Sequence, residues 1–198
     1  MKKRKNNRIL VAGVIVLGLI IFAIYFVSAF KQSQTSQQLF SENDLKARFE
    51  LLKNAKTNFC AGPAFIDYKK DEDRLQGSCC SQMDFHRYAE QIEGLKKYSF
   101  IGLIPSDPYD VPVSTAKQML EYQKTIQLSA DQQKAYDEAV KMSEEGGPCC
   151  CKCWRWYAYE GLAKYLITKY DFSSRQIAEI WDLSDGCGGA GHIEGMHT

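Results

Sequence analysis

The sequence predicts an all-α fold, in which a single N-terminal transmembrane helix precedes a small extracytoplasmic domain of five to six helices with irregular loops. Three observations support this fold class. Apolar residues recur at three- and four-residue spacing in several segments, helix-capping patterns precede some of them, and strand-like alternation is scarce. The 198 residues leave room for one compact domain beyond the N-terminal segment.

A cluster of basic residues opens the chain, and residues 9–30 contain no charged side chain. A helix of that length, about 33 Å, can cross the hydrocarbon core of a bilayer. The positive-inside rule then places everything after Lys31 outside the cytoplasm. The competing interpretation is a cleaved signal peptide, cut after Val27, Ser28 and Ala29, but its apolar region would be unusually long. We therefore interpret residues 1–30 as a basic region and membrane anchor.

Composition divides the rest of the chain into three parts. Residues 31–40 form a polar linker, residues 41–185 a cysteine-rich helical domain, and residues 186–198 a flexible tail with Gly, Cys, His and Met. The formal net charge is +1, and basic and acidic residues are well mixed after the anchor. The distribution of positive charge therefore does not favour a nucleic-acid partner. The sequence does not identify a protein partner.

The first three helices of the domain are predicted at 41–56, 83–95 and 114–126. Ser41 is a suitable N-cap for the first helix. The second presents one apolar face, formed by Phe85, Tyr88, Ile92 and Leu95. Between the second and third, residues 101–112 hold three of the five prolines and predict an extended connector on the surface. A short strand at 64–68 is a weaker expectation.

The last three helices are predicted at 129–144, 148–170 and 173–183. Ser129 with Gln132, and Ser173 with Gln176, have capping-box spacing. Two glycines break the chain before Pro148, a residue that suits the first turn of a helix.

Half of the eight cysteines lie within five positions, as Cys149, Cys150, Cys151 and Cys153. If the helix begins at Pro148, cysteines three and four residues apart share one helix face. Thiols in a first helical turn are close to free backbone N–H groups, which favour the thiolate form. The basic side chains of Lys152 and Arg155 act in the same direction.

Clustered thiolates predict a site for a soft or borderline metal ion, such as Cu(I), zinc or mercury. The further candidate ligands are Cys79, Cys80, His86, Cys187 and His192. Because the tail combines thiolate, imidazole and thioether groups, copper is favoured. The expected role is metal sequestration, delivery or resistance at the membrane, without catalysis.

Two alternatives stay open. Cys150 and Cys153 form a C-x-x-C pair, which is typical of thiol–disulfide redox proteins, although the usual βαβ framework is absent from the predicted elements. An even number of cysteines in an oxidising compartment also fits a non-catalytic interaction domain stapled by disulfides. Cys60 and Cys187, isolated in loops, are then the better candidates for bridges.

The segment from Pro148 to Cys153 fits the pattern P-C-x-C-x-C. In this respect the chain resembles the cysteine-rich extracytoplasmic bacterial proteins named for a P-C-Y-C-G-C motif. Pro148, Cys149, Cys151 and Cys153 match that motif, whereas Cys150 and Lys152 replace its Tyr and Gly. The resemblance implies a membrane-tethered, metal-associated protein. It does not indicate a catalysed reaction. Many members of the group look like lipoproteins, but this chain has no cysteine before Cys60.

Overall fold

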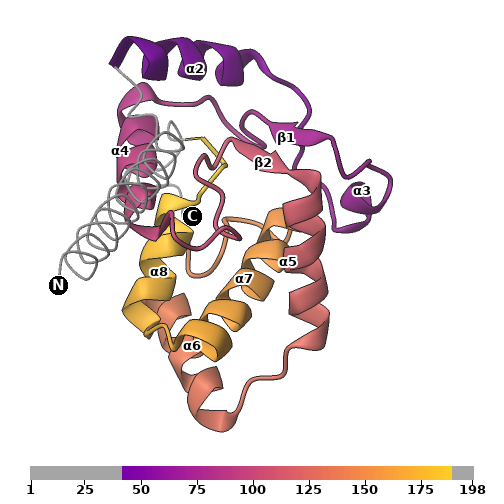
Figure 1. The fold of residues 1–198 in the computed structure, drawn as a ribbon, viewed down its shortest axis with the longest axis vertical. Coiled ribbons are helices and arrows are strands. Elements are labelled where there is room, and N and C mark those ends of the chain that lie inside the picture. The colour runs from indigo at the N-terminus through magenta and orange to yellow at the C-terminus, as the bar shows by residue number, and fades with distance from the viewer. Residues whose placement is uncertain (1–41, 189–198) are drawn as a thin grey trace, which may run out of the picture. The chain divides into compact units, whose positions relative to one another are not determined.

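The computed structural model describes residues 42–188, and this part of the chain is mostly helical (Figure 1). Its elements are, in chain order, α2 (Glu42–Asn54), α3 (Ala64–Asp67), β1 (Arg74–Gln76), α4 (Phe85–Leu95), the 3-10 helix η1 (Lys96–Tyr98), β2 (Asp110–Pro112), α5 (Val113–Thr125), α6 (Ala130–Met142), α7 (Trp154–Tyr170) and α8 (Ser174–Leu183). The six predicted helices are present as α2 and α4 to α8, which is compatible with the all-α class.

The predicted membrane anchor and polar linker, and the N-cap Ser41, lie outside the described residues, as does the tail beyond residue 188. Within residues 42–188, no helix has the length and apolar character needed to span a bilayer.

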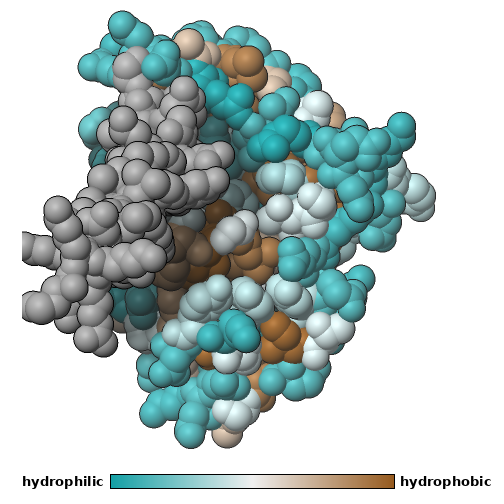
Figure 2. Space-filling model, in the orientation of Figure 1, coloured by the Kyte–Doolittle hydropathy of each residue, from teal (hydrophilic) through white to brown (hydrophobic). Residues whose placement is uncertain are grey.

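Helix α7 is the centre of the domain and contacts α3, α5, α6 and α8 (Figure 1). It is buried on more than one side. One face carries Trp154, Ala158 and Leu162, the neighbouring face carries Tyr159 and Ala163, and all five are buried. On the face shown in Figure 2, hydrophilic residues occupy the outer edge and hydrophobic residues show through between the helices. The core is therefore built around one helix, whose N-terminus follows the cysteine-rich segment.

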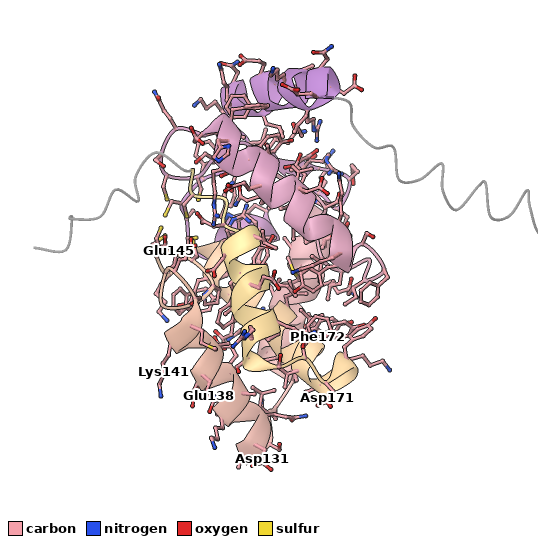
Figure 3. All side chains as sticks on the ribbon, turned by 90° about the vertical axis from the view of Figure 1, so that its left-hand side faces the viewer. Asp131, Glu138, Lys141, Glu145, Asp171 and Phe172 are labelled. Atoms are coloured by element: carbon pink, nitrogen blue, oxygen red, sulfur yellow. The ribbon has the colours of Figure 1, made fainter. Side chains whose placement is uncertain are left out.

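Local capping sets several helix ends. The capping boxes predicted at Ser129 and Ser173 are both present. Asp84 caps α4 by accepting a hydrogen bond from the Arg87 N–H at 2.8 Å. Asp171, labelled in Figure 3, ends α7 in the left-handed conformation with a φ of 54°. Of these ends, the cap at Asp84 closes the loop that carries Cys79 and Cys80.

Two predictions for the first half of the domain were wrong. Residues 64–67 form the short helix α3, with no strand there. The connector at 101–112 is largely buried, because Ile101, Ile104 and Tyr109 pack into the hydrophobic interior. Its end forms β2, which pairs antiparallel with β1. The predicted extended conformation is present only at 110–112, since turns and bends occupy most of 101–109. The apolar residues between the prolines determine that the segment lies inside.

A third prediction, that the helix begins at Pro148, was also wrong. Helix α7 begins at Trp154, and Cys153 is its N-cap residue with extended backbone angles. Residues 149–153 form an irregular turn, closed by a hydrogen bond from the Cys153 N–H to the Cys151 carbonyl at 2.9 Å. A helical turn would point consecutive side chains in different directions around its axis, whereas this turn lets adjacent cysteines converge.

Candidate metal centre

The structure brings all eight cysteines together, although they come from four loops. Cys187, after α8, lies in the middle of the group: its Sγ is 3.3 Å from that of Cys149, 3.3 Å from that of Cys150 and 3.6 Å from that of Cys79. In Figure 3 the sulfur atoms, in yellow, gather on the left side of the domain, just above the labelled Glu145.

The remaining cysteines extend this group on both sides. The Sγ atoms of Cys60 and Cys151 are 3.0 Å apart, those of Cys79 and Cys80 are 3.6 Å apart, and those of Cys149 and Cys153 are 3.8 Å apart. All eight thiols are free. The sulfur atoms therefore contact one another directly, and none of them belongs to a disulfide.

Backbone pairing joins the Cys79 loop to the Cys187 loop. The Cys79 N–H donates to the Gly186 carbonyl at 3.2 Å, and the Ser81 N–H donates to the Cys187 carbonyl at 2.8 Å. Gly188 has a φ of +95°, and a Cβ there would lie 2.6 Å from the Ser81 carbonyl oxygen. Only glycine fits this close approach, so the glycine-rich sequence after α8 positions Cys187 against Cys79.

Asn58 and the start of α7 hold the Cys60 loop in place. The Trp154 N–H donates to the Ala61 carbonyl at 2.7 Å, next to Cys60. The Asn58 side chain is buried; it accepts from the Trp154 indole Nε1 at 3.1 Å and donates to the Gly77 carbonyl at 2.9 Å. One amide therefore ties the Cys60 loop to the Cys79 loop and to α7.

The cysteines form four sets of three, which we call trios, and within each trio all Sγ atoms lie within 4.8 Å of one another. The trios are Cys60, Cys80 and Cys151; Cys79, Cys80 and Cys187; Cys149, Cys150 and Cys187; and Cys149, Cys151 and Cys153. Burial differs across the group, since Cys149, Cys153 and Cys187 are buried and Cys60, Cys80 and Cys150 are exposed. The site has a buried base and a rim that is open to solvent.

A buried guanidinium lies beneath the thiols. Arg155 is fully buried; its Nη1 donates to the Ser184 carbonyl at 3.0 Å and its Nη2 to the Pro108 carbonyl at 2.8 Å. A Cβ on Gly186 would lie 2.4 Å from Nη2, so the loop before Cys187 passes directly over this cation. Burial lowers the pKa of Arg155, but its electrostatic interactions with Tyr159 and with the nearby cysteines raise it, and the net shift is upward. Arg155 is therefore a permanent positive charge beside the sulfurs.

The thiols differ in acidity. The pKa of Cys153 is lowered because its sulfur accepts hydrogen bonds from Cys149 and Cys79, and because backbone N–H groups at the start of α7 add to this effect. The pKa of Cys79 is raised to about 11, chiefly by its hydrogen bond to Cys153. The hydrogen bond to Cys149 is the main cause of the raised pKa of Cys187. The pKa of Cys153 is therefore shifted in the opposite direction from those of Cys79 and Cys187, which lie beside it.

An aromatic side chain packs against one side of the thiols. Trp156 is half-buried beside the buried cysteines, and a Cβ on Gly147 would lie 2.4 Å from its ring. The Lys152 Nζ lies 3.5 Å from the centre of the Trp156 ring. The indole shields this side of the sulfurs from water and holds a second positive charge near them.

The seven cysteines proposed as ligands from the sequence all belong to trios. Cys60, expected only as a bridge, belongs to one as well, and Cys187 is central. Nothing local in the sequence places Cys60 beside Cys151, 91 positions away. The two thiols of the redox alternative, Cys150 and Cys153, share no trio.

His86 is not part of the site, which corrects that prediction. Its side chain is 87% exposed, and its Nε2 lies 3.1 Å from Glu90 Oε1, one helical turn along α4. His86 belongs to the outer face of the helix because Phe85 and Tyr88 point inward. His192 lies outside the described residues.

Comparisons with protein-family models, with curated proteins and with solved structures found no match for this chain.

Proposed function

We propose that this protein binds a soft metal ion, with Cu(I) preferred over zinc and mercury, through the cysteine trios. The observation that carries the proposal is that loops far apart in the sequence bring all eight thiols into one site, with each trio compact enough to hold an ion. Hydrogen bonds within and between these loops position the sulfurs before any ion arrives. A preorganised set of soft ligands suits soft metal ions.

The number of ligands favours copper over zinc. Within residues 42–188, each set of side chains compact enough to hold an ion has three members, all of them cysteines. Structural zinc sites in proteins are almost always tetrahedral and use four ligands. Cu(I) is stable with three thiolates in a plane, so the trios suit it without a further ligand.

The proposed role is sequestration, delivery or resistance at the outer face of a cell membrane, with the domain held by a single-pass anchor at residues 1–30. The uncharged segment 9–30 behind a basic cluster supports the anchor, and the resemblance to the P-C-Y-C-G-C proteins supports the location. The exposed thiols Cys60, Cys80 and Cys150 support exchange of metal with the surroundings, because an incoming ion reaches them first.

A second candidate function is an interaction module stapled by disulfides. One observation favours it: the Sγ atoms of Cys60 and Cys151 are only 3.0 Å apart, so oxidation would need little movement to join them. The two functions differ in what the eight sulfur atoms bind. In the first they bind a metal ion, and in the second they bind one another as disulfides.

The test is elemental analysis combined with a thiol count on the full-length protein, purified in detergent without chelator or reductant. The proposal predicts bound copper that is released when the thiols are alkylated. A double variant, Cys149→Ser with Cys153→Ser, should lose most of the metal while circular dichroism shows unchanged helicity. His86→Ala is the matched control and should keep its full metal content.

Three outcomes of that measurement would reject the proposal. Absence of metal with no free thiols would establish the stapled module. Absence of metal with reactive thiols would favour redox chemistry. Iron with acid-labile sulfide would identify an iron–sulfur protein.

A further inference from the structure

The four trios are not independent of one another. Four cysteines belong to two trios each, namely Cys80, Cys149, Cys151 and Cys187. The other four belong to one trio each, namely Cys60, Cys79, Cys150 and Cys153. Followed through their shared members, the trios form a closed ring in which each trio has two shared cysteines and one of its own.

This connectivity fits one kind of inorganic structure. A thiolate sulfur has enough lone pairs to bind two soft ions at once, and Cu(I) readily accepts such bridging thiolates. In a ring of four Cu(I) ions, each ion with three sulfurs would use one terminal and two bridging thiolates. The trios supply this pattern, with the shared cysteines as bridges.

We infer that the protein holds a cluster of four Cu(I) ions, one in each trio, joined by the thiolates of Cys80, Cys149, Cys151 and Cys187. The inference rests on the proposed function and deepens it by specifying the number and linkage of the ions. Each thiol releases one proton to solvent when its sulfur binds its first Cu(I), and a bridging sulfur forms its second S–Cu bond through a further lone pair of the thiolate, with no further proton released. The copper arrives and stays as Cu(I), so no electron is transferred.

The charges around the site suit such a cluster. Eight thiolates around four singly charged ions leave an excess of negative charge, and burying it requires nearby cations. Arg155 is fully buried, and its guanidinium lies directly against the loop that carries Cys187. Lys152 lies over Trp156 at the side of the same group. A single Cu(I) held by three thiolates would leave a smaller excess of negative charge, so the two cations suit the larger cluster better.

The inference is tested by comparing the loss of a cysteine that belongs to two trios with the loss of a cysteine that belongs to one. Cys60 and Cys80 are both exposed, so replacing either by serine leaves the buried packing intact. Cys60 belongs to one trio and Cys80 to two. The full-length protein, reduced and kept anaerobic in detergent, is titrated with Cu(I) supplied as its acetonitrile complex, and native mass spectrometry counts the bound ions.

The wild-type protein should saturate at four ions, Cys60→Ser at three and Cys80→Ser at two, since the second variant loses a bridge between two trios. Bound Cu(I) should also emit the orange luminescence of water-shielded Cu(I)–thiolate clusters. Equal losses in the two variants would overturn the assignment of Cys80 as a bridge. Saturation of the wild type at one ion would overturn the cluster and leave the proposed function standing, and absence of Cu(I) binding would reject both.

Discussion

The fully buried positive charge beside the thiols belongs to Arg155. Its guanidinium is fully buried, and it is held by the backbone carbonyls of Ser184 and Pro108 at 3.0 and 2.8 Å. A buried cation is costly unless negative charge compensates it. Protonated thiols compensate it little, whereas metal-bound thiolates compensate it fully. Arg155 therefore links the charge state of the cysteines to the stability of the fold.

Replacing this arginine should weaken the stabilisation that metal provides. In Arg155→Met, the rise in Tm on adding Cu(I) should be smaller than in the wild type, because the bound thiolates lose their buried counter-charge. Arg155→Lys, which keeps the charge, should recover part of the rise. Thermal unfolding with and without Cu(I) measures this difference.

Arg74→Met is the matched control, since Arg74 pairs with Asp110 on the β1–β2 ladder and contributes no contact to the thiols. It should lower Tm equally in the two forms. An identical Cu(I)-induced rise in Arg155→Met and the wild type would show that Arg155 serves packing alone.

At the scale of elements, the contact between α5 and α7 positions the end of the thiol-bearing loop that precedes α7. The two helices approach closely at Gly161, where a Cβ would lie 1.9 Å from the Met119 carbonyl oxygen and 2.6 Å from the Gln123 nitrogen. Both atoms are backbone and cannot move without moving α5. Because Trp154 lies on the same helix, this contact also positions Cys153 at the N-terminus of α7.

Gly161→Ala should therefore destabilise the protein, even though alanine favours a helix by about 1 kcal/mol over glycine. Overpacking of a rigid contact costs about 1–3 kcal/mol or more, and here the clash is with backbone, so a net loss of about 2 kcal/mol is expected. Urea unfolding measures it. Gly102→Ala is the control, because a Cβ there meets no atom within 4 Å. Equal stability of the two variants would mean that α5 and α7 can separate without cost.

At the scale of the whole molecule, the site exists only because distant loops are tied together. Cys60 and Cys151 are 91 positions apart in the chain, and Cys79 and Cys187 are 108 apart. The ties include backbone hydrogen bonds and side-chain hydrogen bonds. Among the side chains, Asn58 bridges the Trp154 indole and the Gly77 carbonyl. Loss of these ties would leave the helices in place and separate the thiols.

Asn58→Ala tests this organisation. It leaves a buried indole N–H and a buried carbonyl without their partner, at a cost of about 3 kcal/mol. Helicity should change little, but Cu(I) affinity should fall, because the loops of Cys60 and Cys79 lose their common anchor. A competition titration against a Cu(I) chelator measures the affinity.

Asn54→Ala is the matched control: the Asn54 side chain donates only to the Glu50 carbonyl, one turn back on α2, and is exposed. Its affinity should equal that of the wild type. If Asn58→Ala also binds Cu(I) with wild-type affinity, the remaining hydrogen bonds between the loops are sufficient to assemble the site.

Most of the helical content was predictable because its causes are local. The capping boxes at Ser129 and Ser173 involve residues three positions apart, and the apolar face of α4 repeats at helical spacing. The predicted start of α7 was wrong because Pro148 permits a first helical turn without requiring one. The burial of the 101–112 connector was missed because it depends on pairing with β1, a strand more than thirty positions earlier.

The sequence by itself determined the helices and the chemical class of the site, because helix periodicity, capping and the softness of thiol ligands depend on residue type and short-range spacing. Only the tertiary structure decided which sulfurs meet. It added Cys60 to the site, placed Cys187 at its centre and removed His86. The physical reason is that these contacts depend on hydrogen bonds between loops and on close approaches such as that at Gly188, whose partners lie about one hundred residues away.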